Sequence, residues 1–279
     1  MKNKLLLPSL LSIALLQACG GGGGGDDGAP AAASADTTSS STGTTTTPAA
    51  STSANTGSVS AAFVASSTPR YQLTSVGSQT FGNLNPFVQA ASGAMTTLGS
   101  TVLSGDSATK EISGDATYAM GRWVAGTVTR SSGAETLTGV DSRSYHYLAV
   151  NAPPAFPASG ALTCDAGVFT APTYVSGGSG TGTTGTTSGS ASLSFGAGGA
   201  TVSGSVSVTA SGSAGSASLN STASTVTNTA ITGAYLSGGA GSAVQIGDAG
   251  GGAYLVAASY AATLASGARY IGVAKFRCA

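Results

Sequence analysis

Charged side chains are scarce in this chain. Its 279 residues include ten Lys and Arg and ten Asp and Glu, so charged residues make up 7% and the formal net charge at pH 7 is zero. The basic residues form no cluster, whereas binding to a nucleic-acid backbone needs several neighbouring cations that neutralise phosphates. The composition therefore argues against nucleic acid as a partner.

Histidine occurs once and cysteine three times. Any histidine-dependent catalytic or metal site would have to be built around His146, and the sequence offers no activated nucleophile near it. We interpret His146 as a structural or surface residue. Because no Cys-x-x-Cys pair and no His-spaced ligand pair is present, we expect no metal and no cofactor.

The apolar run near the N-terminus is short. It covers residues 5–16, about a dozen residues, whereas a membrane-spanning helix needs about 20. Lys2 and Lys4 precede the run and a small residue, Ala18, follows it, which is typical of a secretory signal peptide. We therefore predict a signal peptide at residues 1–18.

The residues Leu16-Gln17-Ala18-Cys19 resemble the lipobox of bacterial lipoprotein precursors. This resemblance implies lipidation: Cys19 carries palmitate-type acyl chains and becomes the first mature residue, and two or more chains anchor a protein stably. Gly20 after the cysteine implies, by the same analogy, delivery to the outer membrane, with the periplasmic or cell-surface face left open. The alternative is an ordinary signal peptide that happens to contain a cysteine.

A segment rich in Gly, Ala, Ser and Thr follows, without an aromatic residue up to about residue 60. Such a composition cannot bury enough apolar surface to offset the entropy of ordering. We predict that residues 19–61 comprise the lipidated cysteine and a disordered tether. About forty flexible residues span roughly 35 Å on average, enough to hold a domain away from the headgroups.

Beyond the tether, helical periodicity is missing and short apolar runs alternate with Gly and Ser clusters, which is typical of β-strands. The prolines of residues 153–157 separate two regions. The predicted strands of the smaller β-rich region, 62–158, are Arg70–Val76, Thr96–Leu103, Asp115–Thr129 and Arg143–Val150. Those of the second region, 159–279, are Ala161–Cys164 with its continuation, Ala191–Phe195, Thr201–Thr209, Ala217–Ala223, Val226–Leu236, Ala243–Ile246, Ala253–Tyr260 and Tyr270–Phe276.

Eight short strands without intervening helices favour an antiparallel meander. Eight strands can close around an interior that side chains fill, and closure removes exposed edges. The expected fold is all-β: a closed antiparallel eight-stranded up-and-down β-barrel after the smaller region. Period-two alternation predicts which side chains point inward, namely Val206, Val208, Val244 and Ile246. It predicts that Ser205, Ser207 and Gln245 face outward.

In such a barrel the first and last strands are antiparallel neighbours. Cys164 lies early in the first predicted strand and Cys278 at the end of the last. Disulfides persist in exported proteins, so we predict a Cys164–Cys278 disulfide, with two free thiols as the alternative.

The order of several short motifs resembles bacterial β-barrel domains related to the lobes of transferrin-binding protein B. These motifs are Gly121-Arg122-Trp123, Tyr145-His146-Tyr147-Leu148, residues 156–163, Ser192-Leu193-Ser194-Phe195 running into 202–208, and residues 271–277. The resemblance implies a soluble eight-stranded barrel on an outer-membrane lipoprotein, with a smaller handle-like region packed before it. No ligand-contact residue of that family maps onto this chain, which is too short for two lobes.

Other motifs carry little weight. The residues of 180–185, Gly-Thr-Gly-Thr-Thr-Gly, match a dinucleotide-binding fingerprint but lie in a loop between strands rather than before a helix. Asp106, Glu111 and Asp115 offer a paired-acid site of the glycosidase type, but scattered acids are usually solvated. Trp123 on a strand is more often a core residue than a binding platform. We expect no enzyme.

The leading hypothesis is a non-enzymatic, monomeric outer-membrane lipoprotein. In this hypothesis its barrel binds an unknown protein or small-molecule ligand in nutrient uptake of the iron or haem type. The alternative is a structural or adhesive surface lipoprotein without a discrete ligand site. A membrane-spanning porin-like barrel is disfavoured because no aromatic girdles bracket the strands.

Overall fold

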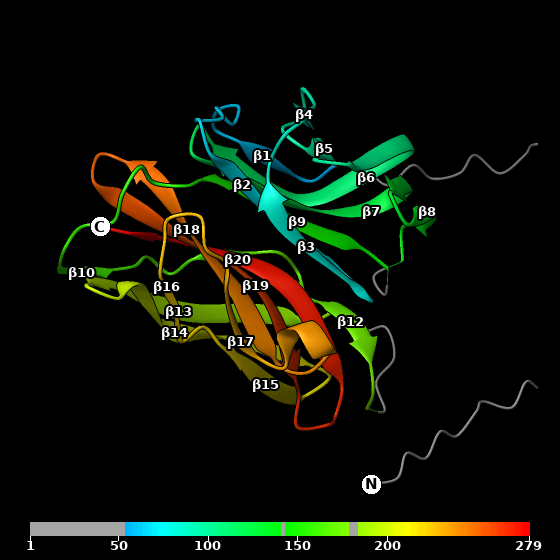
Figure 1. Cartoon of the computed structure of the whole chain (residues 1–279). Helices are drawn as coiled ribbons and strands as arrows, with labels where there is room; N and C mark the ends of the chain where they lie inside the picture. The colour runs from blue at the N-terminus through cyan, green and yellow to red at the C-terminus, as the bar shows by residue number, and fades with distance from the viewer. Residues whose placement is uncertain (1–53, 141–142, 179–183) are drawn as a thin grey trace, which may run out of the picture. The chain divides into compact units, whose positions relative to one another are not determined.

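The computed structural model describes residues 54–140, 143–178 and 184–279, which fold into β-sheets (Figure 1). The expectation of an all-β fold is confirmed. In this part of the chain the helical structure amounts to one 3-10 turn, η1 (Tyr235–Ser237). The signal peptide, Cys19 and most of the tether lie outside the described residues.

No helix in the described part of the chain is long and apolar enough to cross a membrane.

The first region forms a nine-stranded sheet with the order β3-β2-β9-β7-β6-β5-β4, to which β1 adds beside β6 and β8 beside β7. All pairs are antiparallel except β1 with β6. The sheet curls, and one face encloses a core that includes Trp123, Tyr147 and Leu98. Its strands are β1 (Gly57–Val59), β2 (Pro69–Ser75), β3 (Ser78–Asn83), β4 (Phe87–Gln89), β5 (Met95–Leu98), β6 (Thr101–Asp115), β7 (Tyr118–Arg130), β8 (Gly133–Thr138) and β9 (Tyr145–Asn151).

The second region forms two further antiparallel sheets that share one apolar core. The five-stranded sheet contains β10 (Gly160–Thr163), β13 (Thr186–Gly196), β14 (Gly199–Ala210), β15 (Ser213–Ser218) and β16 (Ser221–Ala223). The six-stranded sheet contains β11 (Val168–Phe169), β12 (Thr173–Ser176), β17 (Ala230–Gly233), β18 (Gly241–Gly250), β19 (Ala253–Thr263) and β20 (Arg269–Cys278).

The predicted interior positions are confirmed. Four side chains from the two sheets lie buried in the shared core: Val206, Val208, Val244 and Ile246. Ser207 is exposed and Ser205 half-buried. Gln245 alternates away from the core as predicted but is only 2% exposed. Its surroundings differ from the expectation because the nine-stranded sheet covers the outer face of the six-stranded sheet.

In each of the two cores, a tyrosine ring lies over a glycine of the neighbouring strand. Gly121 pairs with Tyr147, and a Cβ added to the glycine would lie 2.6 Å from the tyrosine hydroxyl. The space lets the Tyr147 ring cross the core, where its hydroxyl accepts a hydrogen bond from the Met95 amide at 3.2 Å. Tyr260 lies over Gly272 in the same way, and its hydroxyl bonds with that of Thr187 on the facing sheet at 3.1 Å.

The structure shows two separate sheets in the second region and not the closed eight-stranded barrel that the sequence predicts. The segment 160–176 joins the two sheets because β10 pairs with β13, whereas β11 and β12 pair with β20. On the other side, among the described residues, no backbone ladder connects β15 or β16 to β17. Two hydroxyls bridge the gap instead: Thr232 and Ser242 both donate to the Ser218 carbonyl, at 3.2 and 2.7 Å.

Several strands differ from the predicted ones. Short, polar β3 and β8 were missed because they lack an apolar period. The predicted strand 226–236 is β17 followed by the 3-10 turn, and β1 lies inside the range predicted as a tether. The predicted strand 115–129 is interrupted because Asp115 accepts hydrogen bonds from the amide and hydroxyl of Thr117, at 2.7 and 2.6 Å, which fixes the turn between β6 and β7.

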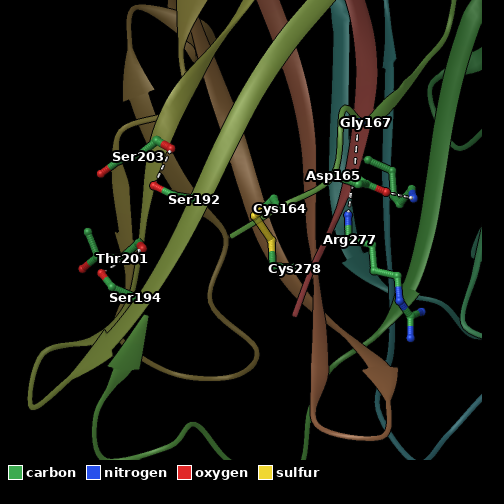
Figure 2. The surroundings of a disulfide bond; sticks show 10 residues. Cys164, Asp165, Gly167, Ser192, Ser194, Thr201, Ser203, Arg277 and Cys278 are labelled. Carbon is green, nitrogen blue, oxygen red and sulfur yellow. Dashed lines mark hydrogen bonds and ion pairs between the residues drawn. A yellow bond between two sulfur atoms is a disulfide. The ribbon is translucent and has the colours of Figure 1, made fainter. Parts of the chain in front are cut away.

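The predicted disulfide is confirmed. Cys164 and Cys278 are bonded, with their Cα atoms 3.8 Å apart and a sequence separation of 114. Figure 2 shows the Asp165 carboxylate beside the bond, where one oxygen accepts hydrogen bonds from the amides of Gly167 and Arg277 at 3.0 and 2.9 Å. Asp165 thereby fixes the corner between β10, which pairs with β13, and β11, which pairs with β20.

Reducing this disulfide is expected to lower the melting temperature without abolishing the fold. The bond closes a long loop, for which the chain-entropy model gives about 4–5 kcal/mol, while the cores contribute most of the stability. Calorimetry with and without reductant measures the shift. The double variant Cys164→Ser, Cys278→Ser is the control and should not respond to reductant. An unchanged melting temperature on reduction of the wild type would contradict the assignment.

Candidate functional site

The six-stranded sheet is buried on both faces and meets the nine-stranded sheet at what we call the junction. Nearly all side chains of β18, β19 and β20 are buried. Apolar residues of both regions meet in one cluster there, formed by Tyr118, Met120, Leu148, Val150, Ala249, Ala253, Leu255, Ala257 and Val273. At Gly247, an added Cβ would lie 2.9 Å from the Val150 Cβ, so glycine permits the close approach of β9.

Two glutamine side chains connect the sheets across the junction. The Gln72 amide on β2 donates to the Ala257 carbonyl on β19 at 3.0 Å. The Gln79 amide on β3 donates to the carbonyl of Tyr235, in η1, at 2.9 Å. Side-chain hydrogen bonds to a facing backbone fix the register of one sheet on the other, which apolar contacts alone do not.

His146 is fully buried in the junction and has a structural role. Its Nδ1 and Nε2 each lie 2.7 Å from a threonine hydroxyl, of Thr170 and Thr173 respectively. Burial, followed by the charge of Arg122, lowers the pKa of His146 well below its ordinary value. The imidazole is therefore neutral and serves as a hydrogen-bond bridge between β9 and the segment beside β20.

The three acids considered as a paired site do not form one. Glu111 makes a two-bond ion pair with Arg122 at 2.8 and 2.9 Å. Asp115 holds its own turn, and Asp106 is exposed. Trp123 is a core residue, whose indole donates to the Met95 carbonyl. Within residues 54–140, 143–178 and 184–279, no three His, Cys, Asp or Glu side chains are grouped to hold a metal ion.

A small cleft of about 120 Å³ opens at one end of the junction. The hairpin between β2 and β3 forms one wall, with Ser75 and Gln79. Val175, Leu236 and Arg269 contribute to the opposite side from the six-stranded sheet and η1. A cation thus lies in a cleft between the two β regions.

A second surface consists of two adjacent loops, 62–68 and 84–94, which we call the Phe87 surface. Two hollows of about 350 and 450 Å³ share Phe87 as a wall. The first hollow has a mixed polar and apolar lining, and the second is lined mainly by apolar residues. Val64 and Val88, in the same loops but outside both linings, are 63% and 51% exposed. In Figure 1 these loops lie at the upper edge of the nine-stranded sheet, near β4.

Side-chain amides hold both loops in place. The Asn151 oxygen accepts from the Ser66 amide and its nitrogen donates to the Val64 carbonyl, both at 2.9 Å. Gln89 acts in the same way: its oxygen accepts from the Phe63 amide at 2.8 Å, and its nitrogen donates to a carbonyl of its own loop. The Phe63 and Phe87 rings pack edge to face, 5.8 Å apart. The surface is therefore preformed rather than flexible.

The structure brings together only part of what the sequence singled out. Cys164 and Cys278 are joined, whereas Cys19 and most of the glycine-rich motif 180–185 lie outside the described residues. Sequence reasoning missed Phe87, Asn151 and Arg269. An aromatic residue after a proline in a polar loop could have indicated Phe87, but nothing in the sequence links Arg269 to the β2–β3 hairpin.

Comparison of the chain with models of known protein families, with curated proteins and with solved structures gives no match. The resemblance to transferrin-binding protein B therefore stays an expectation, and function has to be argued from the geometry.

The buried His146 predicts a pH dependence of stability. The unfolded chain takes up a proton at this imidazole below about pH 6.5, while the folded chain does not because its pKa is lowered. The free energy of unfolding should therefore fall on acidification, by up to about 1.4 kcal/mol per pH unit from this group. Denaturant unfolding between pH 7 and 5 measures the slope. The His146→Gln variant should be less stable than the wild type, and its free energy of unfolding should change less between pH 7 and 5. An equal pH dependence in both proteins would contradict the account.

Proposed function

We propose that the chain is a non-enzymatic outer-membrane lipoprotein that binds a protein partner through the Phe87 surface. The lipobox-like sequence ending at Cys19 and the polar segment after it support an acylated anchor and a tether. A binding domain held at a distance from the membrane can reach a large partner. Uptake of an iron- or haem-carrying nutrient is the process that such a display fits best.

The observation that carries this proposal is the preformed, exposed apolar surface around Phe87. The two hollows share the half-buried Phe87 ring as a wall, and Val64 and Val88 are exposed in the same two loops. Aromatic residues in exposed hollows are a usual feature of protein interfaces. The amides of Asn151 and Gln89 fix the loops before binding, which lowers the entropy lost on association. A monomer presenting one such surface needs no catalytic group.

We further propose that the second region closes into an eight-stranded barrel. In this arrangement β10, β11 and β12 act as one interrupted strand, and β15 and β16 as another. The hydroxyl bridges from Thr232 and Ser242 to Ser218 then span the remaining seam in place of a backbone ladder. Burial of both sheets around one core supports closure.

A specific feature also favours the adhesive alternative. The outer face of β13 and β14 carries a row of exposed Ser and Thr hydroxyls (Figure 2). Some bond to the neighbouring strand, as Ser192 does to the Ser203 carbonyl at 3.3 Å and Ser194 to the Thr201 carbonyl at 3.5 Å. Such an evenly polar surface suits weak contact with many surfaces rather than one partner.

Charge substitutions in the Phe87 surface separate the two functions. Full-length protein in mild detergent is immobilised and exposed to envelope and secreted proteins from iron-replete and iron-starved cultures. We expect a partner that binds saturably to the wild type and is lost from Val64→Asp and from Val88→Asp, because each introduces a charge that the interface would have to bury.

Val140→Asp is the matched control, since Val140 is 50% exposed and the substitution makes the same chemical change elsewhere. The control should bind as the wild type does. Absence of any saturable partner, or equal loss in all three variants, would contradict docking at the Phe87 surface. Retention of adhesion in every variant would support the adhesive function.

A further inference from the structure

The cleft at the junction contains a cation, Arg269, that has no acidic partner within residues 54–140, 143–178 and 184–279. Arg269 extends from the start of β20 into the lining of the cleft. Its side chain is half-buried, and its Nε is fully buried with no hydrogen-bond acceptor among the described residues. The two fully buried cations are paired, Arg122 with Glu111 and Lys275 with Asp165. Arg70 and Arg130 also have a buried Nε without an acceptor, but Arg130 lies 4.0 Å from Glu135, and neither residue lines this cleft.

The surroundings of Arg269 do not offset its charge. No residue lining the cleft in the described part of the chain is acidic. Burial lowers the pKa of Arg269 and the neighbouring Tyr235 opposes this shift, so the arginine remains charged in the cleft. An anionic ligand that enters the cleft would meet the part of the Arg269 side chain that lines it, and a charge-assisted hydrogen bond there is stronger than a neutral one.

The rest of the cleft sets the kind of anion. Val175, Ile271 and Leu236 supply apolar walls, and Leu236 is 60% exposed. Ser75 and Gln79 add polar groups on the hairpin side. One guanidinium matches the single charge and the two oxygens of a carboxylate, whereas phosphate is usually bound by more cations or by a helix N-terminus.

We propose that this cleft binds a carboxylate that carries a short aliphatic group, with the two carboxylate oxygens on Arg269 and the aliphatic group against Leu236 and Val175. A volume of about 120 Å³ admits several water molecules, so a carboxylate with a branched side chain fits while a folded partner does not. The ligand is either a free small acid or the C-terminal carboxylate of a peptide.

A second hollow of about 410 Å³ adjoins the cleft at Val175, and the ion pair of Glu135 and Arg143 also lines it. Val175 lines both hollows, and Val76, which is 42% exposed, lines the second. A peptide ending in the cleft would have this hollow available for its preceding residues. A free acid would have no use for it.

Isothermal titration of the full-length protein with N-acetyl-leucine tests the proposal, with N-acetyl-leucinamide as the uncharged control. We expect saturable binding of the acid and about 10- to 100-fold weaker binding of the amide, the factor that a charge-assisted hydrogen bond supplies. A longer peptide with a free C-terminal leucine should bind more tightly than N-acetyl-leucine if the source is a peptide, and equally if it is a small acid.

Variants assign the binding to the cleft. Arg269→Gln should weaken binding of the acid to the level of the amide, and Arg277→Gln, which removes an exposed arginine nearby in sequence, should not. Leu236→Glu adds a negative charge at an exposed position, so it should abolish binding without unfolding the chain. Equal affinity for acid and amide, no saturable binding to the wild type, or unchanged binding to both site variants would overturn the proposal. These titrations involve no protein partner, so their failure leaves docking at the Phe87 surface unaffected.

Discussion

The six-stranded sheet has two apolar faces, and the rest of the structure follows from the need to cover both. Along β19, almost every residue is buried, so neither face can be exposed to water. The five-stranded sheet covers one face and the nine-stranded sheet covers the other. Burial of apolar surface of this extent is worth roughly 25 cal/mol per Å², which makes the loss of either cover costly. The first region is therefore a structural requirement of the second, and not an appended module.

Buried polar side chains fix how the nine-stranded sheet aligns on the six-stranded sheet. Gln72 and His146 make hydrogen bonds that are available in one alignment of the sheets only. The same alignment places the β2–β3 hairpin opposite Arg269 and so forms the cleft. Asn151, at the end of the strand that contacts the six-stranded sheet, also fixes one loop of the Phe87 surface. The cleft thus depends on how the two regions pack, whereas the Phe87 surface is held by hydrogen bonds within the first region.

The sequence predicted features that depend on local pattern. Period-two alternation placed Val206 and Ile246 inside because one face of each strand meets the core. Antiparallel order brought Cys164 to Cys278. Features that depend on contact between distant segments were not predictable: the sequence could not reveal that a second sheet buries Gln245. Polar edge strands such as β3 show no alternation of apolar and polar residues, since neither of their faces needs to be uniformly apolar.

The candidate site at Arg269 also depends on contact between distant segments, so the sequence alone could not predict it. In the sequence it is one arginine among few charged residues. It becomes a candidate binding residue only because the β2–β3 hairpin lies opposite it and forms a cleft. The Phe87 surface could be predicted only in part, because its shape depends on amides from β4 and β9. By contrast, the lipobox-like residues around Cys19 are consecutive in the sequence, so the resemblance can be recognised without a structure.

Native-state hydrogen exchange tests most directly whether the two regions form one cooperative unit. If the six-stranded sheet needs both covers, the slowest amides of β7 and β9 should exchange with the same opening free energy as those of β19 and β20. Both sets should respond equally to added denaturant, because a single global opening exposes them. A lower opening free energy and a smaller denaturant dependence in β7 and β9, with β19 and β20 still protected, would show that the second region stands without its cover and would contradict the account.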